Sequence, residues 1–253
     1  MPFVTRPGAE IYYEEFGSGY PLMVFAPGGL RSRLEFWKRQ AIALGAPKVW
    51  IDPTTMLADK FRIIAMDQRS APEGQTKGAL EADTDWNVFA KDQLAVADHL
   101  KLDRFHIMGG CIGSSFCLKL CEMVPDRISS AVLQNPIGLG PDNAAVFPEE
   151  FKRWTAEYRA VHPEADLATL EKFRLAMYDH NFVFSVTRDF VKRCQTPLLV
   201  MPGTDAPHPT VIGEEIARIA PNTEIMREWK GEPHIAKAAE VIRAFLDKHT
   251  PKA

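Results

Sequence analysis

The sequence predicts an α/β fold with a doubly wound, mostly parallel sheet and a small helical insertion. Short apolar runs rich in Val, Ile, Leu and Phe recur between helix-length amphipathic segments, and the middle runs lack the alternation typical of a strand with one exposed face. The 253 residues suffice for one large domain carrying an insertion. Alternating strands and helices place ligand chemistry at the carboxyl ends of the strands.

Six short runs are the candidate strands of the parallel sheet. They are Leu22–Ala26, Arg62–Met66, Phe105–Met108, Ser130–Gln134, Leu198–Met201 and Glu224–Glu228. Before them, residues 9–16 and the following Gly17-Ser18-Gly19 are typical of an antiparallel edge strand and its turn. Apolar residues at helical spacing predict one helix over residues 89–100 and a last helix over residues 235–246.

Residues 137–193 interrupt this alternation, because their apolar periodicity is helical throughout. One stripe consists of Phe147, Phe151, Trp154, Tyr158 and Val161, and a second of Leu167, Leu170, Phe173 and Met177. We expect a helical cap over the sheet edge, inserted into a core formed by residues 1–136 and 194–253. Two ordinary crossover helices are the alternative.

Charge and cysteine content narrow the function class. Thirty Lys and Arg stand against thirty-three Asp and Glu, and no run is strongly basic, which argues against nucleic-acid or membrane-surface partners. No apolar stretch would span a bilayer or serve as a signal peptide. Four cysteines without a CxxC pair are too few for a disulfide scaffold or a zinc site. We expect a cytoplasmic protein with a small-molecule substrate, no metal and no cofactor; monomer and homodimer both stay open.

The segment Gly109-Gly110-Cys111-Ile112-Gly113 lies between a predicted strand and a predicted helix. Glycines on both sides relieve the crowding of a sharp turn that strains the backbone of its central residue and exposes its side chain. The N-terminus of the following helix favours a thiolate and a developing oxyanion. Cys111 is therefore the candidate nucleophile.

With this elbow, the chain resembles the α/β-hydrolase fold superfamily, in which Ser commonly occupies the place of Cys111. Residues 17–22, 66–69 and 190–198 carry the resemblance further along the chain. In that superfamily an acid and then a histidine follow the nucleophile, each on a loop after a later strand.

The resemblance implies Asp205 as the acid and His234 as the histidine, with Asp142 as the alternative acid. His234 would take the proton of Cys111, and Asp205 would fix the tautomer of His234. Cys117, the next cysteine along the chain, and the later Cys121 and Cys194 are expected in the core.

An oxyanion hole is implied from the backbone N–H groups of Ile112 and of Gly29 or Leu30. The choice between the last two stays open, because this chain has Pro27-Gly28 where the family commonly has His-Gly. The candidate substrate contacts are Leu30, Arg31, Arg69, His208, Trp154 and Phe182. These candidates have structural alternatives. His208 would be a loop histidine without a functional role, the arginines would form ion pairs within the protein, and the aromatic residues would pack in the core of the cap.

A cysteine at the elbow excludes the haloalkane and epoxide chemistries that need a carboxylate there. A thiolate is also a good leaving group, which favours activated acyl donors over amides. We expect a hydrolase of a small ester, lactone or thioester that forms a thioester acyl-enzyme. An acyltransferase with the same triad, and a slow ligand-binding or sensor protein, are the alternatives.

Overall fold

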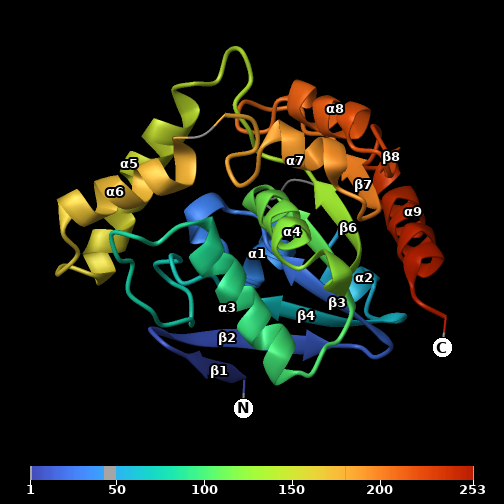
Figure 1. Cartoon of the computed structure of the whole chain (residues 1–253), viewed down its shortest axis with the longest axis horizontal. Helices are drawn as coiled ribbons and strands as arrows, with labels where there is room; N and C mark the ends of the chain where they lie inside the picture. Colours follow the sequence, from blue (N-terminus) through green and yellow to red (C-terminus); the bar gives the residue numbers. More distant parts are fainter. Residues whose placement is uncertain (1, 43–49, 180, 253) are drawn as a thin grey trace.

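The computed structural model describes residues 2–42, 50–179 and 181–252, which contain an eight-stranded sheet (Figure 1). The strand order is β1-β2-β4-β3-β5-β6-β7-β8. The strands are β1 (Phe3–Arg6), β2 (Ala9–Phe16), β3 (Tyr20–Phe25), β4 (Phe61–Met66), β5 (Phe105–Gly110), β6 (Ile128–Gln134), β7 (Leu198–Met201) and β8 (Thr223–Ile225). β2 pairs antiparallel with β1 and β4, and the pairings from β4 to β8 are parallel. The predicted fold class is confirmed.

Helices cover both faces of this sheet. They are α1 (Glu35–Ile42), α2 (Pro53–Met56), α3 (Trp86–His99), α4 (Ile112–Met123), α5 (Val146–Val161), α6 (Leu167–Tyr178), α7 (Arg188–Arg193), α8 (Thr210–Ile219) and α9 (His234–His249), with short 3-10 turns η1 (Gly29–Arg31) and η3 (Pro125–Arg127). A side chain at Gly109 would collide with Gly113 of α4, whereas one at Gly110 would crowd Trp37 of α1. Because successive residues of a strand point to opposite faces, α4 and α1 cover opposite sides of β5 (Figure 1).

β3, β4, β5 and β6 keep within two residues of their predicted bounds at each end, and the larger differences lie at the edges of the sheet. β7 has the predicted bounds, but β8 covers Thr223–Ile225 rather than residues 224–228. β8 is an edge strand with one neighbour, so it ends where its pairing with β7 ends. The sequence pattern did not indicate β1, because only Val4 among its four residues is buried and the apolar signal is correspondingly weak.

Residues 137–193, the predicted cap, contain α5, α6 and α7 and no strand in their described part. Figure 1 shows α5 and α6 beyond the edge of the sheet, apart from the helices on its faces. The indole of Trp154 donates to the carbonyl of Ser70 (2.9 Å). The indole of Trp86 donates to the carbonyl of Met177 (3.0 Å), so hydrogen bonds at two places fasten this segment to the rest of the chain. The division into core and cap stays a prediction.

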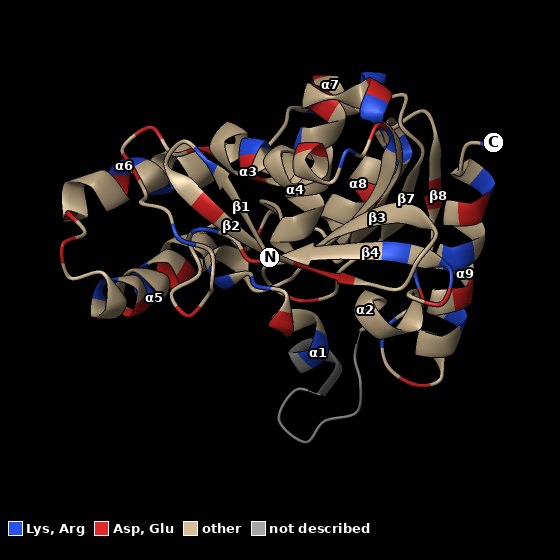
Figure 2. Cartoon of the chain, turned by 90° about the horizontal axis from the view of Figure 1, so that it is seen from below, with Lys and Arg blue, Asp and Glu red and all other residues tan. Residues whose placement is uncertain are grey.

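Charged residues of both signs are interspersed along the helices visible in Figure 2. Several form ion pairs between elements distant in sequence, such as Lys60 with Asp247 (2.5 Å) and Arg188 with Glu215 (2.8 Å). No helix in the described part of the chain is long and apolar enough to cross a bilayer.

Candidate active site

Cys111 lies at a sharp turn between β5 and α4. Its backbone has φ 57° and ψ −120°, a conformation that is strained for a residue with a side chain. Glycines are required nearby, because a side chain at Gly109 would collide with Gly113 and one at Gly113 would collide with the backbone of Phe25. The backbone N–H of Cys111 donates to the carbonyl of Gln134 at the end of β6 (3.0 Å). The turn therefore holds the thiol at the carboxyl edge of the parallel strands.

His208 lies in the loop between β7 and α8, close to Asp205 in sequence and in space. Its Nδ1 is hydrogen-bonded to Oδ1 of Asp205, and its backbone N–H donates to the Asp205 carbonyl (3.0 Å). The imidazole is buried and packs against the indole of Trp50, with ring centroids 6.4 Å apart, whereas the Asp205 carboxylate is half-exposed. Since Nδ1–H donates to a carboxylate, Nε2 is the atom that can take a proton.

The thiol of Cys111 and the imidazole of His208 shift each other's protonation. Burial raises the pKa of the Cys111 thiol, but the charge of His208 and hydrogen bonds to the sulfur outweigh burial, so this pKa lies below its ordinary value. Burial lowers the pKa of His208, but the Cys111 thiolate and the hydrogen bond to Asp205 raise it to about 9. Burial likewise raises the pKa of Asp205, and His208 outweighs it and lowers this pKa. Within the described residues Nε2 of His208 has no hydrogen-bond partner at ordinary distance. Apart from burial, the attraction between opposite charges is the largest effect that each group has on the pKa of the other, and it favours the charged form of both.

Two backbone amides on the loop after β3 also act on the thiol. The backbone N–H groups of Gly28 and Gly29 favour the charged form of the Cys111 sulfur and lower the pKa of its thiol. Both residues have positive φ (118° and 58°), and a side chain at Gly28 would collide with the ring of Phe36. The sequence pattern indicated Gly29 but not Gly28, and the alternative Leu30 lines the neighbouring cavity.

Ile112, the other expected oxyanion donor, is the first residue of α4. Its backbone N–H therefore belongs to the first turn of that helix, where no intrahelical partner exists for it. The assignment of Ile112 and Gly29 to an oxyanion hole stays a prediction.

His234 lies outside this cluster, and here the structure corrects the sequence prediction. It begins α9, does not line the cavity that contains Cys111 and His208, and its backbone N–H donates to the carbonyl of Gly231 (2.8 Å). The histidine beside Cys111 is His208. The loop after β8, where the resemblance implied a histidine, contributes Lys230 to the cavity instead.

The cluster opens into a cavity of about 440 Å³, a volume at the small end of the range for ligand sites. The lining residues come from the sheet-edge loops, α5 and α6: Pro27, Gly28, Gly29, Leu30, Arg31, Trp50, Cys111, Ile137, Phe147, Glu150, Phe151, Trp154, Tyr178, Asp205, Pro207, His208 and Lys230. Aromatic rings form one wall, in which Phe147 stacks on Tyr178 with centroids 5.5 Å apart and Phe151 lies 5.1 Å from Trp154. The site therefore combines an apolar wall with a charged thiol–imidazole–carboxylate row.

Four of the predicted substrate contacts line this cavity: Leu30, Arg31, Trp154 and His208. The guanidinium of Arg31 is already paired with Glu157 (Nη2–Oε1, 3.0 Å) and lies 3.6 Å from Glu150. Phe182 is not among the lining residues, which corrects its expected role. It is buried elsewhere, and the guanidinium of Arg188 lies 4.7 Å from the centre of its ring.

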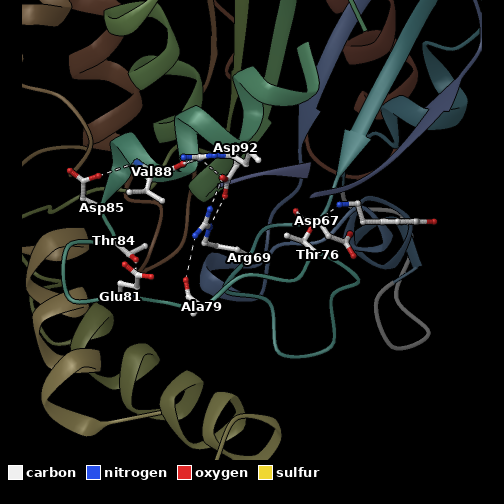
Figure 3. A network of polar contacts seen from close by, with 11 residues as sticks. Asp67, Arg69, Thr76, Ala79, Glu81, Thr84, Asp85, Val88 and Asp92 are labelled. Carbon is white, nitrogen blue, oxygen red and sulfur yellow. Dashed lines mark hydrogen bonds and ion pairs between the residues drawn. The ribbon is translucent and has the colours of Figure 1, made fainter. Parts of the chain in front are cut away.

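Arg69 also lies outside this cavity, in the buried network of Figure 3. Its Nε and Nη2 each donate to one carboxylate oxygen of Asp92 (both 2.7 Å), and its Nη1 donates to the carbonyl of Ala79 (3.3 Å). Arg6 donates to the same carboxylate and to the carbonyl of Val88, so the network joins β1, α3 and the loop after β4. The guanidinium of Arg69 is thus bonded within the protein in a bidentate pair, and the expectation that it contacts substrate is corrected.

Trp50, Tyr178 and Lys230 are among the lining residues that no motif indicated. Burial raises the pKa of Tyr178 above its ordinary value, and the negative charge of Cys111 adds to this effect. Lys230 had one usable signal, since it follows the last strand of the sheet, where side chains reach the carboxyl edge. Trp50 and Tyr178 lie far from the elbow in sequence, so only the fold brings them to it.

The remaining candidates lie apart from the cluster. Asp142, the alternative acid, is exposed and does not line the cavity. Cys117, Cys121 and Cys194 are buried free thiols, and burial raises the pKa of Cys117 well above its ordinary value. Among the residues that the structure describes, His, Cys, Asp and Glu side chains form no group that could hold a metal ion.

Known proteins share this fold and parts of this sequence. A "Probable proline iminopeptidase" from Leptolyngbya boryana is 32% identical over 126 residues, which are 49% of this chain and 34% of that protein. A "Putative carbamate hydrolase RutD" from Agrobacterium fabrum is 31% identical over 91 residues, 36% of this chain and 34% of that protein. The chain thus spans about a third of the length of these curated relatives.

Among solved structures, the enol-lactonase from Burkholderia xenovorans LB400 superimposes with a TM-score of 0.64 at 20% identity, covering 97% of this chain and all (100%) of the other. A likeness at that sequence identity shows the fold alone. The family description "alpha/beta hydrolase fold" matches residues 21–199, well over half of the sequence. With the elbow, the sheet order and this match together, the chain belongs to the alpha/beta hydrolase fold family.

Proposed function

We propose that the protein is a cofactor-free hydrolase of a small ester, lactone or thioester that works through Cys111, His208 and Asp205. The observation that carries the proposal is the row of these three side chains at one cavity, with the thiol pKa lowered and the imidazole pKa raised. Opposite shifts in two groups that face each other are typical of a nucleophile and its proton-transfer partner. The relatives named above, a lactonase, a carbamate hydrolase and an iminopeptidase, are hydrolases by name.

Acylation begins from the charged pair. The Cys111 thiolate attacks the carbonyl carbon, and the electron pair of the C=O bond moves to the oxygen. We assign this developing oxyanion to the amides of Gly28 and Gly29, which also lower the thiol pKa, with the N–H of Ile112 at the start of α4 as the third donor. When the carbonyl re-forms, the leaving oxygen or sulfur takes the proton of His208, which leaves a thioester on Cys111.

Deacylation uses the same groups in reverse. Neutral His208 accepts a proton from water through Nε2, and the resulting hydroxide attacks the thioester carbon. Collapse of the adduct expels the Cys111 thiolate and releases the acid, whose proton goes to solvent. Asp205 holds the His208 tautomer through Nδ1 in both halves of the cycle and stabilises its charged form.

The test is substitution and alkylation of Cys111. With para-nitrophenyl pentanoate as substrate, Cys111→Ala should lower kcat/KM about a thousandfold or more, because the covalent route is lost. Iodoacetamide should inactivate the wild type, with mass spectrometry placing the label on Cys111. Cys117→Ala is the matched control, because Cys117 is buried in α4 outside the cavity.

Three results would contradict the proposal. They are undiminished ester turnover by Cys111→Ala, full activity of the alkylated protein, and a stable acyl-enzyme that never turns over. The last result would favour the ligand-binding alternative. Diversion of the product to an added thiol or alcohol acceptor would instead favour an acyltransferase.

A further inference from the structure

Lys230 places a cation at the edge of the cavity, on the loop after β8. It follows Trp229, whose indole N–H donates to the carbonyl of Pro202 (2.8 Å) and is fully buried. The ammonium of Lys230 lies 5.2 Å from the centre of that ring, and the residue lines the cavity beside Asp205 and His208. The buried indole therefore fixes the position from which Lys230 reaches the cavity.

The ammonium of Lys230 is incompletely satisfied by its neighbours. Its Nζ lies 3.3 Å from Oγ1 of Thr204 and 3.7 Å from Oδ2 of Asp205, and the other oxygen of Asp205 holds His208. An ammonium has three protons to donate, and these two contacts are long. Burial lowers the pKa of Lys230, and the attraction of Asp205 opposes this shift without cancelling it. A closer anionic oxygen would stabilise the group.

The arginine that lines the cavity has no such capacity. Arg31 is bonded to Glu157 through two nitrogens, Nε (2.5 Å) and Nη2 (3.0 Å), and lies 3.6 Å from Glu150. Glu150 itself is paired with Arg153, so this side of the rim is internally neutralised. Of the lysine and the arginine that line the cavity, Lys230 is thus the one that an incoming ligand can pair with.

Taking the proposed hydrolase function as given, we propose that Lys230 binds a carboxylate of the substrate, whose acyl part is therefore a small dicarboxylic half-ester, half-thioester or carboxylated lactone. With Cys111 and His208 as thiolate and imidazolium, as the proposed function has them, the charges of these two groups cancel, and those of Asp205 and Lys230 cancel as well. An anionic substrate therefore meets no net negative charge from these four groups. The aromatic wall formed by Phe147, Phe151, Trp154 and Tyr178 packs against the remaining carbon skeleton.

The test compares two esters of equal chain length, para-nitrophenyl hydrogen glutarate and para-nitrophenyl pentanoate, which differ in the terminal carboxylate. The wild type should favour the glutarate ester in kcat/KM. Lys230→Met should lower the glutarate-to-pentanoate ratio at least tenfold, and Lys230→Arg, which keeps the charge, should restore most of it. Lys237→Met is the matched control, because Lys237 is exposed on α9 and paired with Glu240.

A ratio that stays constant in Lys230→Met while both esters are hydrolysed would overturn the inference and leave the hydrolase function standing. Equal slowing of both esters would do the same, since it would mean that Lys230 only positions Asp205. If the wild type hydrolyses neither ester, the hydrolase function fails, and calorimetric titration with glutarate decides about Lys230. Binding that is lost in Lys230→Met supports the carboxylate site, and absent or unchanged binding rejects it.

Discussion

Two buried histidines at opposite ends of the parallel sheet differ in almost every property except burial. His106 is the second residue of β5, and His208 lies beside Cys111, the residue that follows the last one of β5. Burial lowers the pKa of His106 to about 4. The pKa of His208 is raised to about 9 although burial opposes this.

The partners of each ring explain the difference. His106 Nδ1 and Nε2 contact the hydroxyls of Ser130 (2.8 Å) and Thr250 (2.9 Å), and these neutral groups satisfy an uncharged imidazole. His208 faces a carboxylate and a thiolate, whose charges favour the imidazolium. The raised histidine pKa therefore belongs to the edge of the sheet where charged groups lie together, and burial alone does not produce it.

The largest expected effect separates His208 from the histidine implied by the family pattern. His208→Gln should lower kcat/KM for para-nitrophenyl pentanoate by about a thousandfold or more, because the partner of the thiolate is lost. His234→Gln should stay within about threefold of the wild type, since His234 lies outside the cavity. Steady-state kinetics on both variants decide the point, and the reverse ranking would return the role to His234.

The next effect tests the charge coupling itself. The positive charge of His208 helps to hold the thiol pKa of Cys111 below its ordinary value, so removing that charge must raise this pKa and reduce the thiolate fraction at neutral pH. In His208→Gln, alkylation of Cys111 by iodoacetamide at pH 7 should be about tenfold slower, and its pH profile should shift upward. Mass spectrometry of samples quenched at successive times measures both the rate of alkylation and its pH profile.

The control for this experiment is His106→Gln, because His106 contacts neither the thiol nor the cavity. Its alkylation profile should coincide with that of the wild type. An unchanged profile in His208→Gln would mean that the amides of Gly28 and Gly29 alone stabilise the thiolate.

The two ends of the sheet also differ in how well the sequence predicts them. The strands and the elbow follow from local patterns, since apolar runs give the sheet and the glycines around Cys111 give the turn. The partner histidine does not, because the family order places it after β8, whereas a Pro-flanked turn brings His208 back to Asp205 within one loop. A turn of this kind has no repeating apolar pattern, so the sequence does not indicate it.

Ion pairing was equally inaccessible from the sequence. Their places in the sequence make Arg69 and Arg31 candidate contacts for an anionic substrate, but both side chains are paired with carboxylates of the protein. Asp92 lies 23 positions from Arg69, and Glu157 lies 126 positions from Arg31, so the fold alone makes those pairs. Lys230 is the opposite case, because only the length of its contacts with Thr204 and Asp205 shows its capacity to bind a ligand.

The smallest expected effect concerns the neutral histidine and is one of stability. The pKa of His106 is about 4 in the folded protein and about 6.5 when unfolded. Between pH 4 and pH 6.5, therefore, His106 binds a proton in the unfolded chain but not in the native state. The contribution of neutral His106 to the free energy of unfolding is fully present above pH 6.5 and is lost as the pH falls toward 4. Over that window the free energy of unfolding falls by at most about 1.4 kcal/mol per pH unit from this group.

His106→Gln removes the titrating group, so its Tm should fall less steeply than that of the wild type between pH 7 and pH 5, by roughly 5 °C for a chain of this size. Its Tm at pH 7 should itself be lower, since the hydrogen bonds to Ser130 and Thr250 are disturbed. His162→Gln, at an exposed site beside Glu164, is the matched control and should follow the wild-type slope. Calorimetric melts at the two pH values measure the difference, and parallel slopes for wild type and His106→Gln would mean that His106 is accommodated as a cation. The contrast between the two histidines would then rest on His208 alone, and burial between hydroxyls would be insufficient to keep an imidazole neutral in this fold.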